Sequence, residues 1–156
     1  MDSFPPDPFP GLPPLALPAL SKRRIKDALE RESWSYSVDS DGDIGGLWDS
    51  NWFFFFVMGQ NEEVLNVRAN WRGKLSDQER PAVLEMCNDW NRDKIWPKTY
   101  VGRDDDGFVR VSAEVSVDYE HGLTDEQLSQ QIICAISTSG EFFQTLDEAF
   151  PEATAE

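Results

Sequence analysis

The feature that most constrains the fold is an unbroken apolar run of seven residues, Trp52 to Met58, which is followed by Gly59. The length of the run and its aromatic content predict a β-strand. Because alternate side chains of a strand point to opposite faces, one face carries Phe53, Phe55 and Val57. The other face carries the four candidate partner-binding residues, which are Trp52, Phe54, Phe56 and Met58.

Both faces of this strand are apolar, so both need cover. Three exposed aromatic side chains would present about 450–750 Å² of surface, at about 150–250 Å² each. That equals or exceeds the largest apolar patch of a typical monomer. At about 25 cal/mol/Å², covering it is worth on the order of 10 kcal/mol as an upper bound. The cover can come from the first helix or the Pro-rich N-terminal segment, from a second copy of the chain, or from another polypeptide.

Two further segments, Val64 to Trp71 and Phe108 to Val117, alternate between apolar and polar residues. This pattern is typical of antiparallel strands with one face on the core and the other in water. The strand with two apolar faces is therefore expected at the centre of the sheet. Shorter strands are expected at 34–38, 44–48 and 99–101, with turns at Asp39–Asp43 and Asp104–Gly107.

Three helices are expected around this sheet. Ser21 is expected to cap the first, over 22–32. Ser76 and Glu79 form a capping-box sequence for a second helix that runs to about Asp93, with Pro81 early in it. Thr124, with Gln127 three residues later, begins the last helix, in which Gly140 is a weak point where a kink can form. The order α-β-β-β-β-α-β-β-α, with short turns between neighbouring strands, predicts an α+β domain with an antiparallel sheet.

The chain of 156 residues fits one domain that can bury a core. Residues 1–18 are rich in proline and are expected to form a tail in a polyproline or irregular conformation. The α+β domain is expected over 19–152, with a short C-terminal tail at 153–156. Met1 to Leu20 lacks the early basic residues of a secretory signal, and no apolar run approaches the length of a membrane span.

The charge balance limits the partners that this chain can bind. With 14 basic and 29 acidic residues, the formal net charge is −15. This disfavours nucleic acid and anionic membranes, since phosphate binding depends on Lys and Arg, and it favours basic partners. A basic cluster in the first helix, which consists of Lys22, Arg23, Arg24 and Lys26, is interpreted as a solvated face or as a partner for acidic loops of the same chain. Two cysteines, Cys87 and Cys134, are too few for a disulfide scaffold and suit a reducing compartment, so we expect a cytoplasmic protein.

The sequence offers no combination of residues that suggests catalysis. His121 is the only histidine, which excludes paired-histidine metal sites and weakens every nucleophile–histidine arrangement. There is no Cys-x-x-Cys and no glycine-rich phosphate loop. We therefore expect no enzyme activity, no catalytic residue and no cofactor.

One acidic turn partly resembles a calcium loop. Asp39, Asp41 and Asp43 match its first three acidic positions. Ile44 stands where the loop needs glycine, and Ser50 stands where it needs a bidentate glutamate. We favour a solvated hairpin turn over a cation site, and we expect no metal site in the chain.

Several motifs in their order resemble the YbjN-like domain family, described as bacterial sensory transduction regulators. The matching stretches are Asp39–Ile44 with the aromatic strand after it, Leu65–Trp71, Asn88–Asn91 before Pro97-Lys98, Val117-Asp118 with Gly122–Leu128, and Phe142-Phe143 before Phe150-Pro151. The resemblance covers about residues 19–152. It implies a fold similar to type III secretion chaperones, often dimeric, and it brings no catalytic residues. Asn88 and Asn91 are expected to end their helix by bonding backbone carbonyls.

The leading hypothesis is a non-enzymatic, chaperone-like or regulatory protein that binds another polypeptide, with a homodimer as its expected state. It rests on the strand with two apolar faces, the acidic charge and the lack of catalytic groups. The alternative is a module that binds a small apolar ligand in an aromatic pocket between sheet and helices.

Overall fold

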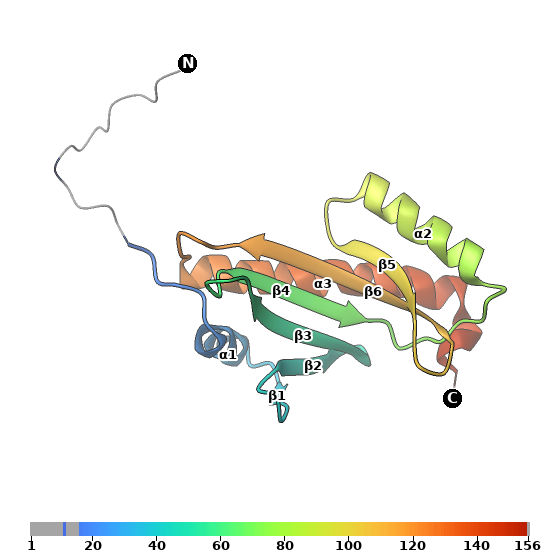
Figure 1. The fold of residues 1–156 in the computed structure, drawn as a ribbon. Coiled ribbons are helices and arrows are strands. Elements are labelled where there is room, and N and C mark those ends of the chain that lie inside the picture. Colours follow the sequence, from blue (N-terminus) through green and yellow to red (C-terminus); the bar gives the residue numbers. More distant parts are fainter. Residues whose placement is uncertain (1–10, 12–15, 156) are drawn as a thin grey trace, which may run out of the picture.

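A computed structural model describes residue 11 and residues 16–155 of the chain (Figure 1). The Pro-rich tail expected at 1–18 therefore lies almost entirely outside the described residues. The order of helices and strands is the one that the sequence predicts, and it confirms the α+β class. None of the helices in the described part is long and apolar enough to cross a membrane.

Six strands form one sheet in which every neighbouring pair is antiparallel. Their order across the sheet is β1-β2-β3-β4-β6-β5. The strands are β1 Ser37–Val38, β2 Ile44–Trp48, β3 Asn51–Met58, β4 Val64–Asn70, β5 Lys98–Arg103 and β6 Val109–Asp118. The aromatic strand β3 has partners on both sides, as its two apolar faces predict.

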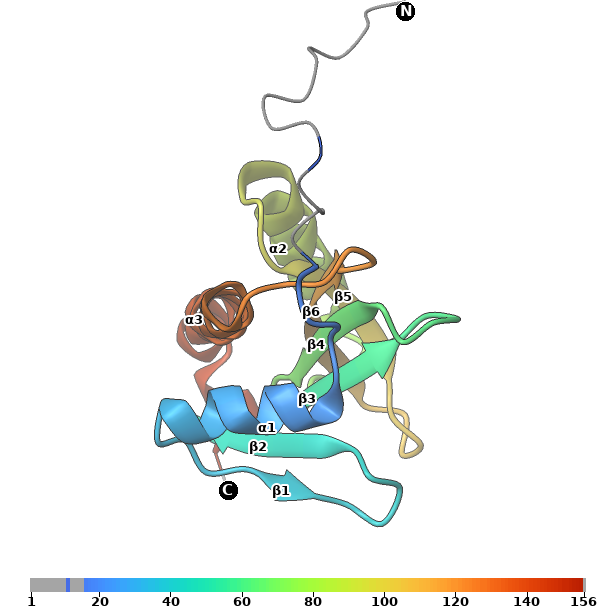
Figure 2. The ribbon, with the colours of Figure 1, turned by 90° about the vertical axis from the view of Figure 1, so that its left-hand side faces the viewer.

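One face of the sheet forms the floor of the core. Phe53 pairs with Ala69 and Phe55 with Val67, and all four side chains are buried. Next to β4, the valines of β6 continue this floor, as their alternation predicts. Figure 2 shows helices α1 (Lys22–Arg31) and α3 (Asp125–Ala149) on this side of the sheet.

Helix α2 (Arg80–Asp93) packs on the same face at the β5 edge. Its Trp90 ring centre lies 5.1 Å from that of Phe142 in α3, and Cys87 O accepts a hydrogen bond from Thr99 Oγ1 at 3.2 Å. All three helices therefore lie on one face of the sheet, and the opposite face carries none of them. We call this opposite face the open face.

The helix starts follow the predicted caps in two cases of three. Ser21 Oγ accepts from Arg24 N at the start of α1, and Thr124 with Gln127 forms a complete capping box at the start of α3. The predicted start of α2 is wrong. Ser76 and Glu79 do bond each other, but in a turn, and the helix begins only at Arg80. Proline is favoured in the first turn of a helix, where its missing N–H is not needed, and Pro81 lies at that place.

The first strand is shorter than expected. Of the segment 34–38, only Ser37 and Val38 pair with β2. Ser33 adopts a left-handed backbone (φ 59°), and the Trp34 ring then packs edge-on against Trp48, 5.9 Å away. Packing of a large aromatic side chain thus replaces strand pairing at this point.

Two of the four residues in the basic cluster of α1, Lys22 and Arg24, contact other segments of the chain. Lys22 donates to Gly42 O at 2.9 Å and lies 3.8 Å from the Asp43 carboxylate, and Arg24 pairs with Asp125 at 2.9 Å. Lys22 and Arg24 thus act as partners for acidic segments, whereas Arg23 is 74% exposed and pairs with Asp27 of its own helix, so both predicted roles occur within the cluster. At the other terminus, a short 3₁₀ turn, η1 (Pro151–Thr154), returns to the domain, and Ala153 O accepts from Lys74 N.

Candidate functional site

The four candidate residues of β3 lie together on the open face. We call Trp52, Phe54, Phe56 and Met58 the aromatic stripe. Trp52 is 47% exposed and Met58 is 44% exposed, while Phe54 and Phe56 are half-buried. No helix of the described chain covers them, because α1, α2 and α3 all pack on the other face. In Figure 1, α3 runs behind the sheet, so that the open face is turned toward the viewer.

The rings of the stripe form an ordered row. The Trp52 and Phe54 ring centres lie 6.0 Å apart with planes 17° from parallel, and Phe54 and Phe56 lie 5.9 Å apart at 11°. The guanidinium of Arg68, on the neighbouring strand, stands 5.5 Å from the Phe56 ring centre. Such contacts hold large side chains in place before any partner arrives, which reduces the entropy cost of binding.

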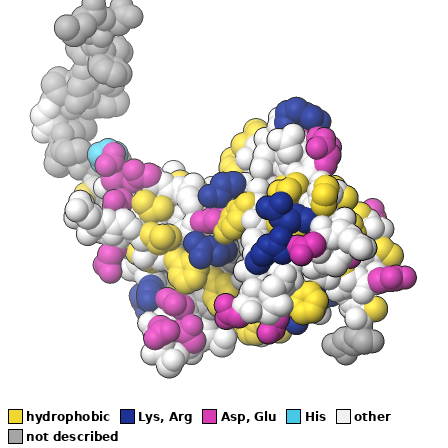
Figure 3. Space-filling model, turned by 45° about the vertical axis from the view of Figure 1, so that its right-hand side comes forward, with side chains coloured by type: hydrophobic (Ala, Val, Ile, Leu, Met, Phe, Trp, Pro, Cys, Tyr) yellow, Lys and Arg dark blue, Asp and Glu magenta, His cyan; other side chains and the backbone are white. Residues whose placement is uncertain are grey.

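A polar network borders the stripe on β4, β6 and β5. Glu114 accepts from Asn66 Nδ2 at 2.6 Å and lies 3.5 Å from Arg68 and 3.7 Å from Lys98. Burial raises the pKa of the Glu114 carboxyl, but hydrogen bonds from Asn66 and Tyr100 and the charges of Lys98 and Arg68 outweigh this, so its pKa lies below the ordinary value of 4.5. The carboxylate is therefore kept ionised as a structural anion. Figure 3 shows hydrophobic side chains and Lys and Arg side chains side by side on this part of the surface.

A pocket of about 320 Å³ opens beside the stripe. Trp52 and Phe54 line it, and Gly45 of β2 lies opposite Phe54 in the sheet. A Cβ atom at Gly45 would lie 3.3 Å from the Phe54 ring and 3.2 Å from Phe53 O. The missing side chain therefore lets the Phe54 ring lie close over β2 and leaves a hollow there.

The pocket has charged side chains of both signs. Asp39 and Asp43 line it from the β1–β2 hairpin, and Arg72 and Arg110 line it from the ends of β4 and β6. This pocket could not be predicted from the sequence, because its walls come from strands far apart in the chain and only the register brings them together. The alternation of β4 and β6 does place polar side chains on this face, but it does not say which of them meet.

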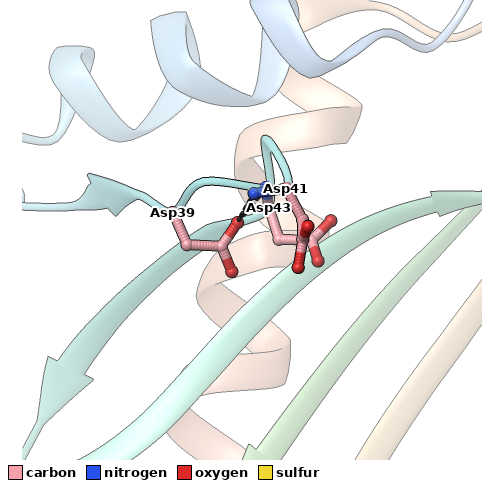
Figure 4. Close-up of side chains that lie close together, drawn as sticks. All are labelled: Asp39, Asp41 and Asp43. Atoms are coloured by element: carbon pink, nitrogen blue, oxygen red, sulfur yellow. Dashed lines mark hydrogen bonds between the residues drawn. The ribbon is translucent and has the colours of Figure 1, made fainter.

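The acidic turn at one side of this pocket is a hairpin turn, as expected. Asp39 N donates to Asp43 O at 3.0 Å, and Asp39 Oδ1 accepts from the backbone N–H groups of Asp41 and Asp43, both at 2.9 Å. Figure 4 shows the Asp39 carboxylate turned toward these nitrogens. Carboxylate oxygens of the three residues lie within 4.8 Å of one another, and Lys22 supplies a positive charge next to them. Backbone bonding and Lys22 thus account for the arrangement of the turn.

The histidine and the two cysteines lie apart from this pocket. The His121 side chain is 92% exposed and faces Glu120 at 3.3 Å. Burial raises the pKa of the Cys87 and Cys134 thiols, which keeps both protonated and poorly nucleophilic.

Asn91 has a structural role, but not the one expected. Its side chain does not bond the carbonyls of its own helix. It accepts from Thr99 N at 2.9 Å and donates to Thr99 O at 3.0 Å, so it pairs with the outer edge of β5 as another strand would. The end of α2 is capped by Lys94 N on Trp90 O instead. An amide side chain that occupies an edge position blocks part of that edge against pairing with other chains.

Comparison with known families decides where this fold belongs. The model of the YbjN family, described as "Putative bacterial sensory transduction regulator", matches residues 21–148. The chain belongs to the YbjN family. No curated protein sequence matches it.

Solved structures agree with this assignment. YbjN from E. coli, described as a putative transcription regulator, superposes with a TM-score of 0.72 at 10% identity, covering 85% of this chain and 96% of the other. A chain of the HopA1–SchA chaperone–effector complex gives a TM-score of 0.52 at 14% identity over 79% and 92%. The Yersinia pestis type III secretion chaperone SycH, in complex with a fragment of YscM2, gives 0.44 at 10% over 77% and 97%. The family match and the likeness to E. coli YbjN confirm the family and the α+β fold that the sequence motifs imply.

Proposed function

We propose that this YbjN-family chain is a non-enzymatic, chaperone-like or regulatory protein that binds another polypeptide through the aromatic stripe. The observation that carries the proposal is the row of Trp52, Phe54, Phe56 and Met58 on a sheet face that no described helix covers. Ordered aromatic side chains on an exposed face are typical of binding anchors, since they bury large areas at low entropy cost. The HopA1–SchA neighbour, whose fold is similar, is described as a chaperone–effector complex, which supports a polypeptide as the ligand.

We further propose that the protein forms a homodimer in the cytoplasm. A second copy is one of the covers that an apolar face of this size favours, and a twofold interface needs only one self-complementary patch. Two buried or half-buried free thiols suit a reducing compartment. If the dimer uses the stripe, then a client and a second copy compete for the same face.

The test is an affinity pull-down from the native cell with three baits: the unaltered chain, Phe54→Asp, and Ile95→Asp as the matched control. Ile95 is 82% exposed in the loop after α2, away from the stripe. We expect the same polypeptides, identified by mass spectrometry, on the unaltered chain and on Ile95→Asp, and their loss on Phe54→Asp. Circular dichroism verifies that both variants fold. A folded Phe54→Asp bait that keeps every partner contradicts the proposal.

The dimer is tested separately by light scattering over a range of concentrations. A mass that stays at one chain at every concentration contradicts the homodimer, whether or not the client is found. It leaves client binding to be decided by the pull-down.

A second candidate is a module for a small apolar ligand, which the pocket beside Gly45 favours by its size and by its Trp52 and Phe54 walls. This function predicts a bound molecule of low mass that co-purifies with the chain in native mass spectrometry. Phe54→Asp should release that molecule, and Ile95→Asp should not.

A further inference from the structure

In the pocket beside the stripe, acidic and basic side chains lie at opposite ends along β3. The register places Ile44 opposite Phe55, so that Asp43 stands near the level of Phe56. It places Asn70 opposite Trp52, so that Arg72 stands beyond Trp52 at the other end. The two rings lie between an acidic end and a basic end.

The acidic end keeps free acceptors. Asp39 uses one carboxylate oxygen, Oδ1, for the two backbone N–H groups of the turn, and the other oxygen has no such bond. Among the described residues, the Asp43 carboxylate has one ion pair, a distant one with Lys22 at 3.8 Å. An incoming ammonium or guanidinium group can therefore bind here without displacing a strong contact, and the neighbouring aromatic faces favour a cation as well.

The basic end keeps free donors. Arg72 is exposed and uses Nη1 for Asp49 O at 3.1 Å. Arg110 forms an ion pair with Asp104 at 3.4 Å and a bond to Trp71 O at 3.3 Å, and since its Nε is buried, only its Nη atoms can reach a ligand. A carboxylate is the group that such guanidinium donors bind best.

We propose that this pocket binds a segment of the partner polypeptide that has an apolar side chain between a basic and an acidic one. This inference rests on the proposed function and names the chemistry of its client. Along β3, the level of Asp43 and the level of Arg72 lie about six residues apart, roughly 20 Å. In an extended segment, residues i, i+2 and i+4 share a face and span about 13 Å, and the length of the basic and the acidic side chain extends this reach toward the two ends of the pocket. The basic side chain lies on Asp39 and Asp43, the apolar one on Trp52 and Phe54, and the acidic one on Arg72 and Arg110.

Charge favours such a segment over a second copy of the chain in this pocket. Two copies, each with a net charge of −15, repel each other at long range. A segment with one charge of each sign carries no net charge, so it meets no such repulsion, and its two ends match the two ends of the pocket.

The test uses blocked peptides and NMR titration of the full chain, followed on the tryptophan indole signals. The reference peptide is Lys-Ser-Phe-Ser-Glu, and two others have Gln in place of its Lys or in place of its Glu. Exposed charge pairs are weak, so we expect each Gln replacement to weaken binding about two- to fivefold. Asp43→Asn should reduce the preference for Lys over Gln and keep the preference for Glu. Arg72→Gln should do the reverse.

Asp39→Asn is a second variant for the acidic end, because an amide oxygen can keep the two turn bonds. Equal binding of all three peptides, or charge preferences that both variants leave unchanged, overturns the charge assignment. If Phe54→Asp still abolishes binding of all three peptides, the aromatic stripe remains a polypeptide site with no charge preference. If no peptide binds the unaltered chain, the inference falls, while the pull-down with its Phe54→Asp bait decides the proposed function.

Discussion

Arg24 joins the segment just before α1 to the start of α3, about a hundred residues further along the chain. Its guanidinium donates to Pro18 O and Ala19 O at 2.8 and 3.0 Å, and to Leu123 O and the Asp125 carboxylate at 2.8 and 2.9 Å. Its side chain is only 15% exposed. It therefore fixes the entry into α1 against the start of α3, and the hydrogen bond from Arg24 lowers the pKa of Asp125.

At this scale we predict that Arg24→Gln lowers the free energy of unfolding by about 1–3 kcal/mol. Several charge-assisted hydrogen bonds are lost, and carbonyl groups are left without their donor. The matched control is Arg23→Gln, because Arg23 is 74% exposed and pairs only with Asp27 on its own helix. It should change stability by no more than about 0.5 kcal/mol. Urea unfolding followed by circular dichroism measures both free energies of unfolding. Equal effects would show that the hydrogen bonds of Arg24 do not contribute to stability.

For the strands, the alternation of apolar and polar residues was enough to predict which side chains face the core. The faces of β3, β4 and β6 were readable because one buried face forces a period of two. Tertiary packing decided where individual helices and strands begin and end. Trp34 leaves the strand pattern because Trp48 offers a better contact, and α2 starts late because Pro81 suits a first turn.

The site was predictable only in part, for the same reason. The aromatic stripe follows from the period of one strand, so its residues could be named from the sequence. The pocket depends on which strands are neighbours and on the register between them. The residues around Gly45 and Arg72 in the sequence do not indicate that both line the same pocket.

In helix α3, Gly140 is a position where a substitution is expected to stabilise the protein. The sequence left open a kink at Gly140, but the helix runs unbroken from Asp125 to Ala149. A Cβ atom at Gly140 would have nothing within 4 Å. Gly140→Ala should therefore raise the free energy of unfolding by about 0.5–1 kcal/mol, since glycine costs that much in a helix interior.

Gly122 is the control for this substitution. Its φ is +82°, and a Cβ atom there would lie 2.4 Å from Leu17 O. Gly122→Ala should destabilise the chain where Gly140→Ala stabilises it. Thermal unfolding of the two variants compares them directly, and a loss of stability in Gly140→Ala would mean that α3 needs flexibility at that point.

At the scale of the whole molecule, the net charge of −15 opposes the fold. Charges of one sign repel in the compact state, and salt screens that repulsion, with a Debye length of about 30 Å at 0.01 M and about 10 Å at 0.1 M. The melting temperature should therefore rise with NaCl between these concentrations, by about 2–4 °C for each kcal/mol gained. Ion pairs such as Arg24–Asp125 weaken with salt, but they are few against the excess of negative charge.

The matched variant replaces Glu85, Glu141 and Glu148 by glutamine. All three are exposed on helices and form no ion pair within the described residues. Removing three of the fifteen excess negative charges should reduce the rise of the melting temperature with salt, because less repulsion is left to screen. Differential scanning calorimetry at the two salt concentrations measures the two slopes. Equal slopes would contradict the assignment of the salt effect to the excess of negative charge.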